Sequence, residues 1–216
     1  MNASTPSPAQ GNLWIVSAPS GGGKTSLSRA LLPRLTALGV QAQISVSCTT
    51  RAPRAGEQDG AHYHFIDEAH FVERIAAGAF LEHAQVFGRR YGTSRAETET
   101  LLVQGIDVIL DIDWQGARQV RTTMPEAKSV FILSPSRPEL ERRLRGRGTD
   151  ADHIIAERMA QARDEMSHYA EYESLVVNAD FETALQQLIA LFLTPRLALS
   201  RQKARHEALI AELLEN

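Results

Sequence analysis

"LWIVSAPSGGGKTSLSRALL", residues 13–32, carries the strongest structural signal in this chain of 216 residues. The apolar run at 13–18 predicts a buried strand, and the pattern over 24–38 predicts a helix with a kink at Pro33. The glycine-rich turn between them gives the order strand, loop, helix. That order is typical of a P-loop, whose backbone N–H groups surround phosphates at a helix N-terminus. The stretch therefore predicts a site for a nucleoside triphosphate.

Each position of this loop has an expected role. Gly21 and Gly23 allow the backbone to approach the phosphates closely. Lys24 supplies charge to the β and γ phosphates, and Thr25 offers its hydroxyl to Mg²⁺. Ala18 stands where the motif ordinarily begins with glycine, and alanine can serve there if its backbone is extended. The expected donor-binding residues of the loop are Ala18, Pro19, Ser20, Gly21, Gly22, Gly23, Lys24, Thr25 and Ser26.

Four further apolar runs alternate with helical patterns along the chain. The runs lie at 43–47, 107–113, 129–133 and 174–179, and the next helices are expected at 114–124 and 136–145. Such alternation predicts an α/β fold with a parallel five-stranded sheet covered by helices. The expected core comprises residues 13–47, 105–140 and 171–216.

Other stretches do not fit a simple strand–helix alternation. Residues 48–104 carry their own strand and turn signals and predict an inserted subdomain, whereas residues 141–170 predict a helical lid rich in arginine. Residues 1–12 are polar and predict a disordered lead-in to one domain over 13–216. The segment from Thr194 predicts an amphipathic helix docked on the body, although its pattern does not distinguish docking from assembly into a homo-oligomer.

Composition excludes several classes of protein. A hydrophobic fraction of 43% and a charged fraction of 23% are ordinary for a globular protein. A net charge of −3 argues against a general nucleic-acid partner. The chain has no apolar run near the ~18 residues of a membrane span. A single cysteine, Cys48, excludes an internal disulfide and fits a reducing, cytoplasmic location.

Acidic residues at the end of the 107–113 run complete the donor site. Asp111 and Asp113 point to the same face because strand side chains alternate. One of them is expected to reach Mg²⁺ through water, as acidic residues in this position of P-loop proteins do. Asp111, with Thr25, is the candidate metal-side residue, and the division of roles with Asp113 stays open.

A second anion site is indicated by "SCTTRAPR", residues 47–54, where Arg51 and Arg54 follow a run of hydroxyls. An acceptor that is itself a phosphate needs positioning and charge neutralisation rather than a strong base. An alcohol acceptor would instead require a carboxylate after the second strand, where this chain has Ser47. The pattern favours a nucleoside monophosphate as acceptor.

These segments resemble guanylate kinase, in order and in spacing. The matching stretches are "SAPSGGGKTSL", "SVSCTTRAPRAGEQDGAHYHF", "FLEHAQVFGRRYGTS", "VILDIDWQGARQVR" and "RLRGRG…ERM". The resemblance runs from about residue 12 to the C-terminus and is closest to bacterial, stand-alone enzymes. It implies the P-loop nucleoside-monophosphate-kinase fold, the reaction ATP + GMP ⇌ ADP + GDP with Mg²⁺, and GMP binding by residues 48–104.

Site roles follow from the resemblance position by position. The residues matching the GMP phosphate site are Arg51, Arg54, Tyr63 and Tyr91, and those matching the guanine site are Ser47, Glu82 and Thr93, with Asp113 assisting. Arg147 and Arg158 resemble lid arginines that close over the donor and, with Lys24 and Arg51, form the expected catalytic set. Arg142, Arg143 and Arg145 fit a solvated helix face equally well. Asn178 falls near the expected adenine pocket.

The chemistry of guanine agrees with the position of Glu82. Guanine presents an N1–H and a 2-amino group side by side, and one carboxylate accepts both hydrogens. Adenine presents an acceptor at N1 and lacks the amino group, so the same carboxylate rejects it. A non-catalytic guanylate-kinase-like binding domain is the alternative, but Lys24 and Thr25 argue against it. A regulatory GTPase is disfavoured because no N-K-x-D sequence occurs.

Overall fold

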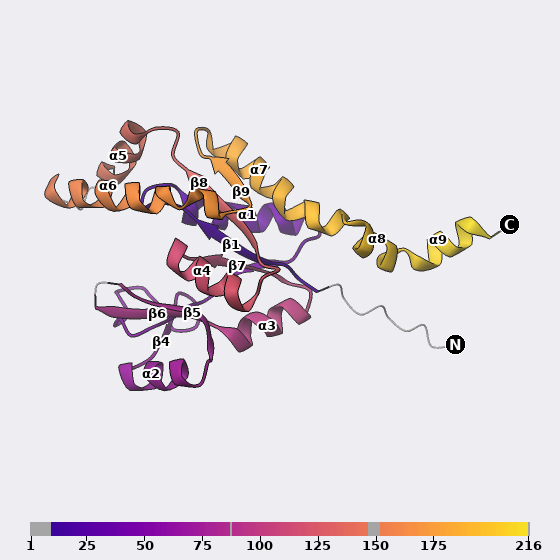
Figure 1. Cartoon of the computed structure of the whole chain (residues 1–216), viewed down its shortest axis with the longest axis horizontal. Coiled ribbons are helices and arrows are strands. Elements are labelled where there is room, and N and C mark those ends of the chain that lie inside the picture. The colour runs from indigo at the N-terminus through magenta and orange to yellow at the C-terminus, as the bar shows by residue number, and fades with distance from the viewer. Residues whose placement is uncertain (1–9, 87, 147–151, 216) are drawn as a thin grey trace.

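The computed structural model describes residues 10–86, 88–146 and 152–215, and its centre is a parallel sheet of five strands (Figure 1). The strand order is β2-β7-β1-β8-β9. The strands are β1 (Leu13–Ser17), β2 (Ala42–Ile44), β7 (Asp107–Asp111), β8 (Lys128–Leu133) and β9 (Ser174–Val177). Each overlaps one predicted apolar run, and every pairing in this sheet is parallel, so the predicted fold class is confirmed.

Helices cover both faces of the sheet because alternate residues of β1 point to opposite sides. Trp14 and Val16 pack with α1 (Lys24–Ala37) and α7 (Phe181–Leu193). The ring of Trp14 stacks on Phe192, with ring centroids 4.1 Å apart. Leu13 and Ile15 pack on the other side in a second cluster that includes residues of α3 (Arg95–Val103) and α4 (Trp114–Thr123). Two apolar layers thus hold the P-loop end of β1 in place.

Residues between β2 and α3 form a smaller unit with its own sheet. Its strand order is β4-β3-β6-β5, and β5 and β6 pair antiparallel. The elements are β3 (Cys48–Thr49), β4 (His64–Phe65), α2 (Glu68–Ala76), β5 (Phe80–Val86) and β6 (Arg89–Ser94). Cys48, Phe71 and Phe80 form a separate buried cluster, so this insertion has a small core of its own.

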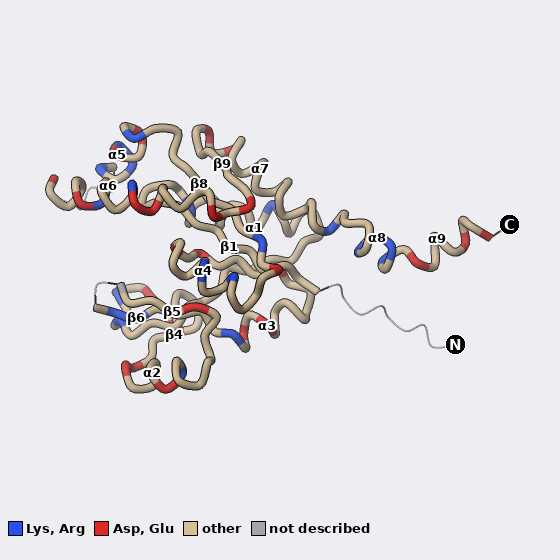
Figure 2. The backbone as a smooth tube through the Cα atoms, viewed as in Figure 1, with Lys and Arg blue, Asp and Glu red and all other residues tan. Residues whose placement is uncertain are grey.

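The lid region contains two helices with many charges of both signs (Figure 2). They are α5 (Arg137–Arg145) and α6 (Asp152–Ser167), followed by the short η1 (Tyr169–Glu171). α5 begins before the expected lid boundary, with the side chain of Ser136 accepting a hydrogen bond from the Glu139 N–H as helix cap. Residues 147–151 of the predicted lid, which include Arg147, lie outside the described residues.

The prediction of one docked C-terminal helix was wrong. The segment divides into η2 (Thr194–Leu197), α8 (Leu199–Arg205) and α9 (Glu207–Leu214), and the last two extend away from the body (Figure 1). The helix breaks at His206, whose φ of −114° and ψ of 22° are not helical. Leu213 and Leu214 are 73% and 76% exposed. An amphipathic pattern requires a covering partner, but it does not specify which surface provides it.

The folded part of the chain begins earlier than residue 13. The Gly11 N–H donates to the Leu102 carbonyl at 2.8 Å, and the Asn12 N–H donates to Asp107 at 2.7 Å. Asn12 is buried, so the expected lead-in boundary at residue 12 was wrong, and residues 1–9 lie outside the described chain. Among the described residues, no helix has the length and apolar character to cross a membrane.

Candidate active site

The loop between β1 and α1 has the backbone geometry of a phosphate-binding turn. Gly21 and Gly23 have φ values of 86° and 95°, in the left-handed region that favours glycine. A Cβ atom at Gly21 would lie 3.1 Å from Leu144, and one at Gly23 would collide with the amide of Asn178. Of the predicted loop residues, 18–23 connect β1 to α1, and 24–26 form the first turn of α1.

Lys24, Thr25 and Asp111 come together at the carboxyl ends of β1 and β7. Lys24 Nζ lies 2.6 Å from Asp111 Oδ1, and it also donates to the Ile112 carbonyl at 3.2 Å. Thr25 Oγ1 donates to Asp111 Oδ2 at 3.2 Å. The hydroxyl and the carboxylate are adjacent oxygen donors of the kind that Mg²⁺ prefers. Asp111 is therefore placed beside both the lysine and the threonine of the loop.

Asn178, which follows β9, contacts the backbone of the P-loop. Its side chain is 4% exposed, and its Nδ2 donates to the Gly22 carbonyl at 3.1 Å. The backbone carbonyl of Asn178 accepts from Arg143 Nη2 at 3.0 Å, which links α5 to the same point. The buried amide thus faces the P-loop backbone, and its expected contact with adenine stays a prediction.

Arg51 lies in a cluster with aromatic rings on the inserted subdomain. Its guanidinium is 5.3 Å from the Tyr63 ring centroid, and the Tyr63 and Tyr91 rings are 6.0 Å apart. Arg51 Nη2 donates to Glu57 Oε1 at 2.8 Å, and this hydrogen bond lowers the Glu57 pKa to about 2. The Arg54 N–H donates to the same carboxylate at 2.7 Å. Sequence reasoning missed this orienting Glu57, although it stands three residues after Arg54.

Glu82 and Thr93 form a buried pair across β5 and β6. They are 5% and 1% exposed, and Thr93 Oγ1 donates to Glu82 Oε1 at 2.6 Å. Burial raises the pKa of Glu82 to about 7, and the charge of Asp113 adds to this rise. A Cβ atom at Gly116 would lie 3.1 Å from Glu82 Oε2, so only a glycine leaves that oxygen its present space. Gly116 had no distinguishing sequence signal beyond its place in "WQG".

Asp113 and Ser47, the remaining acceptor candidates, are held by backbone contacts. Asp113 caps α4, with its Oδ1 accepting from the Gly116 N–H at 2.9 Å. Ser47 precedes β3, and its carbonyl accepts from the His64 N–H at 2.9 Å. The capping bond fixes Asp113 close to Glu82, while direct contacts of either residue with guanine stay predictions.

The lid arginines divide into two groups. Arg142 Nη2 and Arg143 Nε lie 2.7 and 2.8 Å from Glu139 Oε1. Arg145 pairs with Glu141 at 2.9 Å and also with Asp152. The pairs of Arg142 and Arg145 with Glu139 and Glu141 follow helical spacing and fit a solvated helix face. Arg143 also contacts the Asn178 carbonyl, and the Arg145–Asp152 pair joins α5 to α6. Arg158 belongs to α6 instead, while Arg147 lies outside the described residues.

A P-loop core that carries both an inserted subdomain with paired arginines, Arg51 and Arg54, and a helical lid defines a P-loop nucleoside monophosphate kinase. The Guanylate kinase family model matches residues 10–194. The chain is 60% identical over 206 residues to guanylate kinase of Salmonella choleraesuis (strain SC-B67), covering 95% of this chain and 99% of that protein. Guanylate kinase of Escherichia coli (strain K12) is 59% identical over the same length and coverage. The chain belongs to the guanylate kinase family.

A solved structure agrees with this assignment. The crystal structure of guanylate kinase from Anaplasma phagocytophilum is similar with a TM-score of 0.70 and 32% sequence identity. The likeness covers 89% of this chain and 90% of that one. The inserted subdomain and the lid therefore belong to a fold shared with a guanylate kinase of known structure.

Proposed function

We propose that this protein transfers the γ-phosphoryl group of ATP to GMP and so produces ADP and GDP. The observation that carries the proposal is the buried Glu82–Thr93 pair near the P-loop. Burial raises the Glu82 pKa while the charge of Lys24 opposes that rise, so the carboxylate and the P-loop lysine act on each other. A carboxylate suited to guanine and a loop suited to a triphosphate thus belong to one site.

The transfer itself requires charge neutralisation and alignment. The P-loop N–H groups and Lys24 would hold the β and γ phosphates, while Arg51, Tyr63 and Tyr91 would hold the phosphate of GMP. An oxygen of that phosphate attacks the γ-phosphorus of ATP, and the bond to the β–γ bridging oxygen breaks. Because the attacking oxygen is already anionic, no strong base is needed. Arg54 would add positive charge beside the acceptor.

Thr25 and Asp111 fit the metal that accompanies ATP. Their oxygens are 3.2 Å apart, beside the lysine of the loop. Bound Mg²⁺ would neutralise charge on the β and γ phosphates. Lys24 would then exchange its ion pair with Asp111 for contact with phosphate oxygens.

The choice of guanine would depend on Glu82. Thr93 fixes one of its oxygens, and the ionised carboxylate can accept from the N1–H and 2-amino groups of guanine. Ser47 and Asp113 would complete the base site. Arg158, with Arg147, would close over the donor from the lid and stabilise charge on the transferring group.

An assay with several acceptors tests the proposal. ADP formation is measured with ATP, Mg²⁺ and GMP, dGMP, AMP or UMP, each at the same concentration. We expect turnover with GMP that exceeds turnover with AMP and UMP at least a hundredfold. Equal rates with AMP would contradict the assignment of the base, and binding of GMP without any ADP would favour the non-catalytic domain.

The cellular setting follows from this activity. Supply of GDP from GMP is a step of purine nucleotide metabolism, and the substrates ATP and GMP are intracellular anions. Cys48 is the only cysteine and is a free, buried thiol, which fits the reducing conditions of the cytoplasm. We therefore place the protein in the cytoplasm, with no nucleic-acid or membrane partner.

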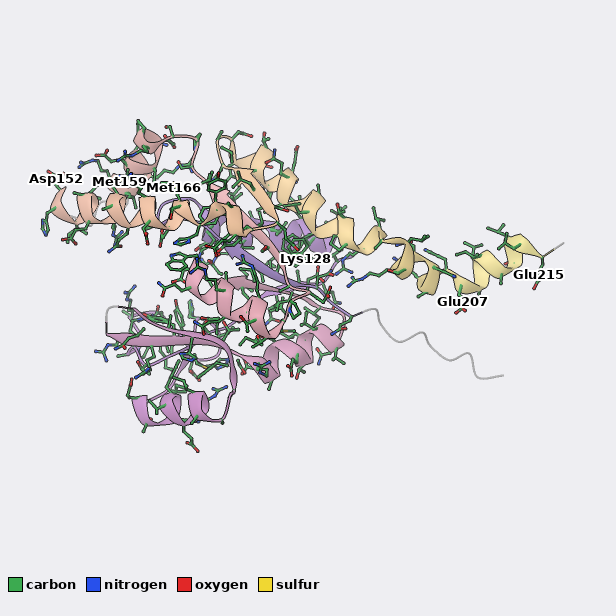
Figure 3. All side chains as sticks on the ribbon, in the orientation of Figure 1. Lys128, Asp152, Met159, Met166, Glu207 and Glu215 are labelled. Atoms are coloured by element: carbon green, nitrogen blue, oxygen red, sulfur yellow. The ribbon has the colours of Figure 1, made fainter. Side chains whose placement is uncertain are left out.

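Self-association would cover the projecting C-terminal helices α8 and α9, and Glu207 and Glu215 mark the course of α9 in Figure 3. Helices of seven and eight residues are marginal in water unless a partner packs on them. α8 carries Arg201, Lys203 and Arg205, whereas α9 carries Glu207 and Glu212. An antiparallel pair of two copies would place each basic helix against an acidic one.

Sedimentation velocity over a range of protein concentrations tests this homo-oligomer. We expect the full-length protein to associate and the Leu213→Glu, Leu214→Glu double variant to be monomeric. A full-length protein that stays monomeric at all concentrations would contradict the pairing.

A further inference from the structure

One face of lid helix α6 carries the buried residues of that helix. Ile155, Arg158, Ala162 and Glu165 recur at the spacing of a single helical face. Ile155 and Ala162 are 2% and 0% exposed, which shows that this face is the packed one. Figure 3 marks the course of α6 by Asp152, Met159 and Met166.

At the end of this face, Glu165 contacts the P-loop directly. Its Oε2 accepts a hydrogen bond from the Ser20 N–H at 3.0 Å. Burial raises the pKa of the Glu165 carboxyl, while the Ser20 hydrogen bond and the charge of Lys24 oppose that rise. The carboxylate is thus half-buried at the edge of the loop that binds the donor.

A carboxylate in this place needs a physical reason, because it repels the phosphates of a bound nucleotide. The oxygens beside Thr25 belong to Asp111, so Glu165 is not needed as the metal-side acid. Glu165 instead accepts a hydrogen bond from the backbone N–H of Ser20, in the first half of the loop. A charge-assisted bond to a backbone amide holds position well, because neither the amide nor the helix can rotate away freely.

We propose that Glu165 is a positioning residue that ties lid helix α6 to the P-loop and thereby sets the place of Arg158 at the donor phosphates. The inference rests on the proposed function, in which Arg158 acts from the lid. Arg158 lies seven residues earlier on the same face, which is about two helical turns or ~10 Å along α6. Glu165 is fixed near the C-terminal end of α6, so the helix would pivot about that end. The part of α6 that carries Arg158 would then move when the lid closes.

A second contact from the lid supports this coupling. Leu140 and Leu144 of α5 are buried and lie where any side chain at Gly21 would have to fit. The lid therefore contacts adjacent loop residues through both helices, by packing at Gly21 and by a hydrogen bond at Ser20. Only the Glu165–Ser20 hydrogen bond can be removed without leaving a cavity in the apolar core.

The test compares Glu165→Ala, Glu165→Gln and the control Asp164→Ala, which changes the exposed neighbour on the same helix. Steady-state kinetics give kcat and separate KM values for ATP and GMP. We expect Glu165→Ala to lower kcat/KM for ATP about tenfold or more, with the KM for GMP changed less than about twofold. Glu165→Gln keeps an acceptor oxygen and should recover most of the loss, and Asp164→Ala should behave as wild type.

A binding-independent readout accompanies the kinetics. The chemical shift of the Ser20 amide proton is followed by NMR as the pH is varied in the nucleotide-free protein. It should titrate with the Glu165 carboxyl, with a midpoint above that of an ordinary glutamate, and this titration should vanish in Glu165→Gln. The NMR experiment needs no turnover, so it distinguishes failure of this contact from failure of the proposed reaction.

Three results would overturn the inference. Wild-type ATP kinetics in Glu165→Ala would show that the contact is dispensable. Equal damage in Glu165→Gln and Glu165→Ala would show that the charge matters, not the hydrogen bond. A Ser20 amide that ignores pH in the wild-type protein would show that the contact is absent in solution.

Discussion

Thr93 donates its hydroxyl hydrogen to Glu82 across two neighbouring strands, with 2.6 Å between Thr93 Oγ1 and Glu82 Oε1. The two residues are directly paired in the register of β5 and β6. This bond fixes the carboxyl group while its second oxygen lies against Gly116 at the start of α4. The acceptor subdomain and the P-loop core therefore meet at one buried carboxyl group.

The binding of GMP should depend on pH through this group. Burial raises the Glu82 pKa from 4.5 to about 7, and guanine needs the ionised form because both its N1–H and amino groups donate. GMP affinity should fall as the pH drops below about 7, by as much as about tenfold per pH unit. Titration calorimetry between pH 8 and pH 5.5 measures the GMP affinity, and repeating it in a series of buffers counts the protons released when GMP binds. A flat profile would contradict the assignment.

The raised pKa of Glu82 also affects the stability of the fold. Its contribution to stability changes with pH in the opposite direction to the GMP affinity. Between the ordinary pKa of 4.5 and the folded value of about 7, the folded protein holds a proton that the unfolded chain releases. The Glu82 contribution to the free energy of unfolding therefore decreases as pH rises through this window. Comparing the melting temperatures of wild type and Glu82→Gln from pH 5 to pH 8 isolates that contribution, because the glutamine does not titrate.

Lys24→Ala should reduce kcat by about three orders of magnitude or more while GMP binding changes little. The lysine contacts Asp111 and the donor loop, and the acceptor cluster is on a separate sheet. Loss of one fixed positive charge at the transferring group has this scale of effect. Turnover near the wild-type rate would remove the basis for assigning the loop to ATP.

Arg51→Ala and Arg54→Ala should weaken GMP much more than guanosine, because the missing partner is the phosphate. We expect a loss of about tenfold or more for GMP, since charge-assisted bonds are involved. Arg89→Ala, an exposed arginine on β6, is the matched control. Titration calorimetry with both ligands decides: equal losses for GMP and guanosine would mean that the arginines only support the subdomain.

Gly116→Ala should impair the acceptor site by crowding Glu82 Oε2, the oxygen that Thr93 does not hold. The added methyl would lie 3.1 Å from Glu82 Oε2 and must displace the carboxyl by a few tenths of an ångström. Such a displacement of an orienting group should lower kcat/KM for GMP roughly tenfold and leave the KM for ATP unchanged. Gln115→Ala in the same helix is the control. Unchanged GMP kinetics would show that the carboxyl adapts freely.

The central sheet was predictable because its strands are buried on both faces and so appear as apolar runs. The P-loop was predictable because its chemistry needs adjacent residues. Contacts between distant segments were not predictable from the sequence. The hydrogen bond from Asn178 to Gly22 spans 156 residues, and the Glu165–Ser20 contact spans 145. Glu165 does share a helical face with Arg158, but that spacing alone does not identify the surface it meets.

The C-terminal segment shows a different limit. Its apolar spacing correctly predicted helix, yet the break at His206 and the projection of α9 depend on what covers the leucines. A sequence pattern describes a face and leaves its partner unspecified. The strands of the inserted subdomain were also hard to predict. β3 and β4 have two residues each and therefore carry little periodic signal.

Selection of guanine by Glu82 is measured with the Glu82→Gln variant. kcat/KM is measured for GMP and for AMP with both wild type and variant at saturating ATP. The amide loses a charged acceptor and brings a donor toward the guanine N–H groups, so kcat/KM for GMP should fall roughly ten- to a hundredfold. AMP should lose less, which narrows the GMP:AMP preference while the KM for ATP stays near its wild-type value. If GMP and AMP activities fall by the same factor, Glu82 is a structural residue and the guanine assignment is contradicted.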